Sequence, residues 1–141
     1  MKARIKWIEN ACYVAESGSG HAVIVDGPPD IGGRNLGVRP MELVLMGVGA
    51  CSAVDVVHIL KKSRQDVTDC ECELEAERAE TDPKVFTKIR MHFKVSGRGL
   101  KENQVARAVQ LSAEKYCSAS IMLKSGGVAI THSHEMLELP G

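Results

Sequence analysis

The chain has 141 residues, 44% of them hydrophobic, which is enough for one compact domain with an apolar core and excludes a mainly disordered protein. Its 18 basic and 18 acidic residues give a formal net charge of zero, and no segment concentrates lysine and arginine, so we do not expect nucleic acid as a partner. The charged N-terminus contains no apolar stretch of signal length, so we expect a cytoplasmic protein. Five cysteines at irregular spacing do not form a secreted disulfide framework.

The first forty residues predict a β-hairpin followed by a loop. Residues 3–16 alternate loosely between apolar and polar side chains, and the turn Ser-Gly-Ser-Gly connects them to residues 21–26. Residues 27–39 are rich in glycine and proline and predict a loop long enough to border a site. Its cations, Arg34 and Arg39, are the ones best placed to approach Cys51 on the next element, either as partners of a thiolate or as ordinary solvated loop charges.

Residues 41–62 predict a long helix. Pro40 suits the first helical position, and Glu42 lies in the first turn. The helix is apolar almost all round, which indicates burial on every side, and we expect a second copy of the chain to supply part of that cover. Asp55 and His58 interrupt the apolar run, so we do not expect membrane insertion. Glycines at positions 47 and 49 predict a break before Cys51.

The second half predicts two strands, two helices and a closing strand. Residues 70–77 and 85–95 alternate strictly and form an antiparallel pair, with acidic and basic outer faces opposite each other. Residues 101–116 and 118–124 are helical, and 128–139 is a strand. The inward stripe of the first of these helices is Val105, Ala108, Val109, Ser112 and Tyr116. The order predicts a single α+β domain over residues 1–141, with antiparallel sheets around two long helices.

Two cysteines are candidates for chemistry. Cys51 and Cys117 both lie near predicted helix N-termini, where the helix dipole favours the thiolate, while apolar surroundings oppose it. Two buried structural cysteines would give the same pattern. A Cys-His-Asp arrangement of Cys51 with Asp55 and His58 on one helix has poor geometry for proton transfer. Glu42 reaches the thiol only if the helix breaks at the glycines.

Two other pairs resemble metal-ligand motifs. Cys70 and Cys72, like His132 and His134, are separated by a single residue and lie on predicted strands. Structural zinc sites use wider gaps that contain turns, so we expect no metal site. The inward face of a strand accounts for the two cysteines, and we expect the two histidines to be exposed.

Three segments carry a family resemblance: residues 37–52 (GVRPMELVLMGVGACS), 83–97 (PKVFTKIRMHFKVSG) and 112–124 (SAEKYCSASIMLK). Together they resemble the OsmC/Ohr family, in particular its YhfA-like branch. The resemblance implies the OsmC-like fold, an intertwined homodimer whose two long central helices are wrapped by sheets.

The resemblance also implies a thiol peroxidase for organic, fatty-acid-like hydroperoxides. Cys51 is then the peroxidatic thiolate that becomes a sulfenic acid, and Cys117 is the resolving thiol that forms a disulfide with it. No bound cofactor is implied, because an external dithiol of the lipoyl type reduces the pair.

This sequence departs from the family's charged groups. The best-studied peroxidases hold the thiolate with an early arginine and with a glutamate that follows the helix-opening proline. Here Met41 follows Pro40 and the acid is Glu42, while Arg34 and Arg39 lie closer to the helix than the usual arginine. A non-enzymatic alternative therefore stays open, in which the protein is a redox sensor or binds an apolar ligand in the dimer groove.

Overall fold

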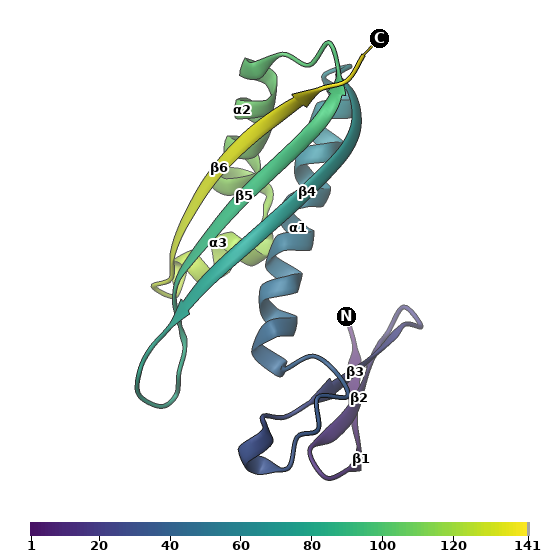
Figure 1. Cartoon of the computed structure of the whole chain (residues 1–141), viewed down its shortest axis with the longest axis vertical. Helices are drawn as coiled ribbons and strands as arrows, with labels where there is room; N and C mark the ends of the chain where they lie inside the picture. Colours follow the sequence, from purple (N-terminus) through teal and green to yellow (C-terminus); the bar gives the residue numbers. More distant parts are fainter. Residues whose placement is uncertain (141) are drawn as a thin grey trace. The chain divides into compact units, whose positions relative to one another are not determined.

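The computed structural model describes residues 1–140 (Figure 1). It divides into two compact units, Met1–Val44 and Leu45–Gly141. The elements are α+β in type, as the sequence predicts, with three strands in each unit.

The first unit is an antiparallel sheet of three strands rather than the two of the expected hairpin. These are β1 (Ala3–Glu9), β2 (Cys12–Ser17) and β3 (Ala22–Asp26), in the order β1-β2-β3. The predicted single strand over residues 3–16 is wrong because a turn divides it at Asn10, whose φ of 48° is left-handed. Asparagine tolerates that conformation better than most residues.

A buried carboxylate organises the loop that follows. This loop contains the short 3-10 helix η1 (Pro29–Ile31). Asp26, whose exposed fraction is 1%, accepts hydrogen bonds at Oδ2 from the backbone N–H groups of Arg34 (3.0 Å) and Leu36 (3.1 Å). These two bonds lower the pKa of Asp26 below its ordinary value.

The helix α1 (Pro40–Lys62) confirms the predicted range and has no break. Its N-terminus is closed by Glu42, whose Oε1 accepts the N–H of Arg39 at 2.9 Å, one half of a capping box. The predicted break is wrong because Gly49 serves a tertiary contact. A Cβ there would lie 2.5 Å from Leu74 Cδ1, so the absent side chain lets β4 approach the helix closely.

α1 is long and apolar enough to span a membrane. The core helix of a globular protein meets the same two criteria of length and composition. Met46 and Val54 are large apolar side chains that α1 leaves exposed among the residues described.

The sheet of the second unit has the order β4-β5-β6. β4 (Asp66–Arg78) and β5 (Phe86–Arg98) are antiparallel, and their outer faces pair acids with bases as predicted; Lys94 Nζ, for example, lies 2.8 Å from Glu73 Oε1. β6 (Ala129–Glu138) pairs with β5 in parallel, which departs from the expected antiparallel arrangement. Val85, predicted to face inward, precedes β5 and is exposed.

Three helical segments connect β5 to β6. They are α2 (Glu102–Leu111), the π-helical turn η2 (Ser112–Tyr116) and α3 (Ser118–Ser125). The predicted inward stripe is confirmed through Ser112 but is wrong at Tyr116, which is exposed. A π turn has more residues per turn than an α-helix, so it rotates the later side chains off the stripe.

Figure 1 shows α2, α3 and the C-terminal part of α1 on one face of the sheet β4-β5-β6. The fully buried core there comes from α1, β5 and α2. Its large members are Val48, Val56, Leu60, Ile89, Met91, Phe93, Val95 and Val105.

The anchoring of the loop by Asp26 predicts an acid-sensitive first unit. Because the pKa of Asp26 is lowered in the folded state, its stabilising effect is complete above the unfolded value and is lost as the pH falls through the folded value. Asp26→Asn should therefore unfold more easily at neutral pH and lose less stability on acidification than the parent. Urea unfolding followed by the fluorescence of Trp7, the single tryptophan, measures both effects.

Asp30→Asn is the matched control, because Asp30 lies in the same loop and is exposed. It should unfold like the parent at both pH values. Equal acid sensitivity in Asp26→Asn and the parent would contradict the role given to Asp26.

Candidate functional site

The fold brings Cys51, from the middle of α1, together with Cys117, which directly precedes α3. Their two Sγ atoms and a carboxylate oxygen of Asp55 all lie within 4.8 Å of one another. Both cysteines are free thiols. Residues distant in the sequence thus form one thiol pair with an acid beside it.

Cys117 is fully buried, and two donors hold its sulfur in place. Ser52 Oγ donates to Cys117 Sγ at 3.1 Å, and the backbone N–H of Ser120 donates to the same atom at 3.4 Å. The second bond makes the sulfur the N-cap acceptor of α3. The backbone of Cys117 is held as well, because its N–H donates to the carbonyl of Ser112, the first residue of η2, at 2.8 Å.

The surroundings of Cys51 favour its thiolate. Burial raises its pKa, but hydrogen bonds from the Ala119 N–H, the Cys117 thiol and the Ser118 hydroxyl outweigh burial, so that the pKa lies below its ordinary value. Ser118 Oγ lies 3.8 Å from Cys51 Sγ. The negative charge of Asp55 opposes this shift.

The helix N-terminus near Cys51 is not the one predicted. Cys51 does not begin a helix, because α1 is continuous through it. The donors come instead from the first turn of α3, at Ser118 and Ala119. The electrostatic effect expected from the sequence is therefore present, but a helix much later in the chain supplies it.

The hydroxyl of Ser112 ties Asp55 and the backbone of Ser52 to the segment that carries Cys117. Ser112 Oγ lies 3.3 Å from Asp55 Oδ2 and 3.4 Å from the carbonyl oxygen of Ser52, so it donates to either. Asp55 thus shares the thiol cluster, as the helical spacing predicts, whereas the exposed His58 does not belong to it. Sequence reasoning missed the serines, although the dipeptide Cys-Ser, present at both cysteines, was an available signal.

The other predicted site residues, Arg34, Arg39 and Glu42, belong to the first unit and have partners there. Arg34 Nη2 lies 2.7 Å from a carboxylate oxygen of Glu9, which raises the pKa of the arginine. Arg39 Nη1 donates to the Gly37 carbonyl at 3.0 Å, and Glu42 caps α1. Their roles beside the thiolate stay predictions.

The pairs Cys70/Cys72 and His132/His134 lie on strands, where burial and neighbouring side chains determine their properties. Burial raises the pKa of Cys72 to about 11, with smaller contributions from Cys70 and Cys117, so Cys72 is a poor nucleophile. The expectation of exposed histidines is wrong. His132 is half-buried and stacks on Phe93 with ring centroids 6.5 Å apart, and His134 Nε2 lies 2.6 Å from Glu102 Oε1.

The thiol cluster is also the place where a metal ion could bind. Cys51, Asp55 and Cys117 offer two thiolates and a carboxylate, a ligand set that suits a thiophilic ion such as Zn²⁺. A tetrahedral site needs a fourth ligand, which a water molecule can supply.

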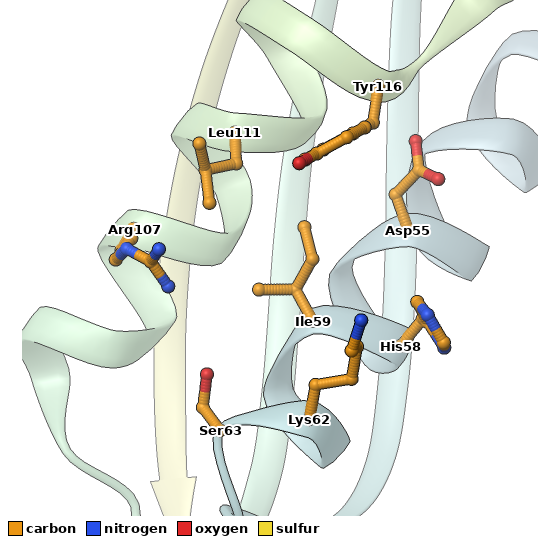
Figure 2. A pocket seen from close by; sticks show the side chains of 8 residues that line it. All are labelled: Asp55, His58, Ile59, Lys62, Ser63, Arg107, Leu111 and Tyr116. Carbon is orange, nitrogen blue, oxygen red and sulfur yellow. The ribbon is translucent and has the colours of Figure 1, made fainter.

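A cavity of about 500 Å³ begins at Asp55 (Figure 2). It lies between the C-terminal half of α1 and the segment formed by α2 and η2. Its lining residues are Asp55, His58, Ile59, Lys62, Ser63, Arg107, Leu111 and Tyr116. Because Asp55 is shared, the cavity and the thiol cluster are neighbours.

Comparisons with known proteins agree on one family. The model of the OsmC-like protein family matches residues 32–133. The chain is 53% identical over 137 residues to Protein YhfA of Escherichia coli strain K12, which covers 97% of this chain and 98% of that protein.

Solved structures resemble the chain over nearly its whole length. A hypothetical protein from Aquifex aeolicus VF5 is 31% identical with a TM-score of 0.86, and the match covers 99% of this chain and 97% of that one. An organic hydroperoxide resistance protein OsmC from Legionella pneumophila is 21% identical with a TM-score of 0.69, covering 95% of each chain. The likeness to the second structure concerns the fold alone.

The two polar neighbours of Cys51 predict opposite effects on its acidity. Ser118→Ala removes a hydrogen bond that favours the thiolate and should raise the pKa of Cys51, whereas Asp55→Asn removes an opposing negative charge and should lower it. The pH dependence of iodoacetamide alkylation at Cys51, followed by mass spectrometry, measures both shifts. Shifts of the same sign in the two variants would contradict this account.

Proposed function

Because the chain belongs to the OsmC family, we propose that it is a thiol peroxidase that reduces organic hydroperoxides at Cys51, with Cys117 as the resolving thiol. The observation that carries the proposal is the thiol pair itself, whose sulfur atoms lie within 4.8 Å of each other. The lowered pKa of Cys51 supports its role as the nucleophile. The name of the Legionella pneumophila structure, an organic hydroperoxide resistance protein, agrees with this chemistry.

In the first step the Cys51 thiolate attacks the terminal oxygen of the hydroperoxide. The O–O bond breaks, the terminal OH group stays on sulfur as a sulfenic acid, and the departing alkoxide takes one proton from solvent to become an alcohol. The half-exposed position of Cys51 gives a peroxide access to its sulfur. The donors at Ala119 and Ser118 keep the thiolate populated before the attack.

In the second step the Cys117 sulfur attacks the sulfur of the Cys51 sulfenic acid. Hydroxide leaves and takes up the thiol proton as water, and a disulfide forms. The bond requires the sulfurs to approach to about 2 Å. Burial of Cys117 against Cys51 leaves its sulfur few other targets, because Ser52 and Ser120 hold it in place.

Two electrons from an external dithiol then restore both thiols. We propose a cytoplasmic dithiol of the lipoyl type, as the family resemblance implies, and no bound cofactor. We also propose a homodimer, since α1 leaves apolar side chains such as Met46 and Val54 exposed in the single chain.

The proposal predicts the fate of each thiol. One equivalent of an organic hydroperoxide should consume two thiols per chain and give a disulfide between Cys51 and Cys117. Cys117→Ser should stop at a sulfenic acid on Cys51, which dimedone traps, and Cys51→Ser should lose at least about a hundredfold in rate because no thiolate of low pKa remains. Thiol titration, stopped-flow kinetics and peptide mapping measure these outcomes.

Cys70→Ser is the matched control, because Cys70 is a half-buried thiol whose pKa is raised by burial. It should react like the parent. If Cys51 reacts no faster than a free thiol and no disulfide forms, the peroxidase proposal fails. Binding of an apolar ligand that is unchanged in Cys51→Ser would then favour the non-enzymatic alternative.

A further inference from the structure

Asp55 has no part in the peroxidase chemistry proposed above, yet it lies among the thiols. It follows Cys51 by one turn of α1, so the two side chains share a face of the helix, and Cys117 joins them from the turn before α3. None of the ion pairs formed among residues 1–140 involves Asp55. Two thiolates and a carboxylate this close repel one another, and a divalent cation bound between them would offset that repulsion.

The spacing of the three ligand atoms suits a tetrahedral ion. The two Sγ atoms and a carboxylate oxygen of Asp55 all lie within 4.8 Å of one another. Zinc binds sulfur at about 2.3 Å and carboxylate oxygen at about 2.1 Å, so a tetrahedral site holds such atoms about 3.5–4 Å apart. Small movements of the side chains bring the cluster to that separation. Two sulfur ligands favour a thiophilic ion such as Zn²⁺ over Mg²⁺ or Ca²⁺.

Buried serines already orient two of the ligands. The Cys117 sulfur accepts hydrogen bonds from Ser52 Oγ at 3.1 Å and from the Ser120 N–H at 3.4 Å. Ser112 Oγ can donate to Asp55 Oδ2, at 3.3 Å, which leaves Oδ1 for an ion. Hydrogen bonds of this kind fix metal ligands in place and strengthen binding.

An ion can reach the cluster from solvent. Cys51 and Asp55 are half-buried, and only Cys117 is fully buried. Asp55 also lines the cavity in Figure 2, so water reaches its carboxylate and can supply the fourth ligand.

We propose that the reduced protein binds one Zn²⁺ ion through Cys51, Cys117 and Asp55, and that the bound ion protects Cys51 from oxidation. Each thiol that binds the ion loses its proton to solvent, and no electron is transferred.

Two effects of the ion protect the thiols. It shares the sulfur lone pair with which Cys51 would attack a peroxide. It also holds the two sulfurs about 3.8 Å apart, well beyond the length of about 2 Å that a disulfide bond requires. The ion is thus a reversible inhibitor and not a cofactor. A disulfide offers no thiolate, so the oxidised pair does not bind it. Inhibition of peroxide reduction rests on the peroxidase proposal, whereas binding of the ion does not.

Cobalt reports the ligands without any variant. Co²⁺ added to the reduced full-length protein should give the visible bands of a tetrahedral ion and a near-ultraviolet charge-transfer band with the intensity of two thiolates. Zn²⁺ should then displace it. Absence of the charge-transfer band would overturn the metal site.

Variants identify the ligands by isothermal titration calorimetry with Zn²⁺. Cys51→Ser and Cys117→Ser should each weaken binding by about a hundredfold, and Asp55→Asn by about tenfold or more, because each loses a ligand. Cys70→Ser/Cys72→Ser is the matched control, because it removes the pair of cysteines on β4. It should bind like the parent. Unchanged affinity in Asp55→Asn, or a loss in the control, would overturn this ligand set.

Alkylation measures the protection without any peroxide. Zn²⁺ should slow the reaction of Cys51 with iodoacetamide by about tenfold or more and leave that of Cys70 unchanged, and EDTA should restore the rate. The zinc-loaded protein should lose its reaction with an organic hydroperoxide in the same proportion. Binding of Zn²⁺ without a slower alkylation of Cys51 would overturn the protective effect.

The outcomes separate this inference from the peroxidase proposal. If Zn²⁺ binds and protects Cys51 from iodoacetamide, but the metal-free protein does not react with hydroperoxide, the metal site stands and the peroxidase proposal fails. If Zn²⁺ neither binds nor protects while hydroperoxide consumes both thiols, the metal site is overturned and the peroxidase proposal stands.

Discussion

The thiol pair depends on hydrogen bonds that hold the turn before α3 against α1. Ser52, Ser112 and Ser120 are almost completely buried, and a buried hydroxyl without a partner is costly, by about 1–3 kcal/mol. Each of them finds its partner within this cluster: Ser52 on the Cys117 sulfur, Ser112 on Asp55 or the Ser52 carbonyl, and Ser120 on the Cys117 carbonyl. Small side chains also permit the close approach of the two helical segments. The same contacts that satisfy the buried hydroxyls therefore bring the two sulfurs together, so structure and reactivity have one origin here.

The charge balance at Cys51 follows from this arrangement. Within the second unit, its thiolate is favoured by hydrogen bonds and by the N-terminus of α3, and the nearest charge that acts on it, Asp55, is unfavourable. Dipolar donors of this kind are fixed by the backbone and need no long side chain to become ordered. An acid that reduces the population of thiolate is a cost to the peroxidase chemistry. Its carboxylate also offers an acceptor, at 3.3 Å, to the hydroxyl of the buried Ser112.

The sequence predicts the parts of the fold that depend on local patterns. Pro40 and the terminal lysines place both ends of α1, and strict alternation with opposite charges places β4 beside β5. Tertiary contacts decide the remainder. Gly49 does not break α1, because Leu74 occupies the space beside it. Alternation gives no strand direction, so the parallel pairing of β6 could not be foreseen. For the site, the family resemblance implied the pairing of Cys51 with Cys117. The serines that support the pair could not be predicted, because their hydroxyls and the groups that accept from them lie on α1 and on the segment around Cys117, far apart in the chain.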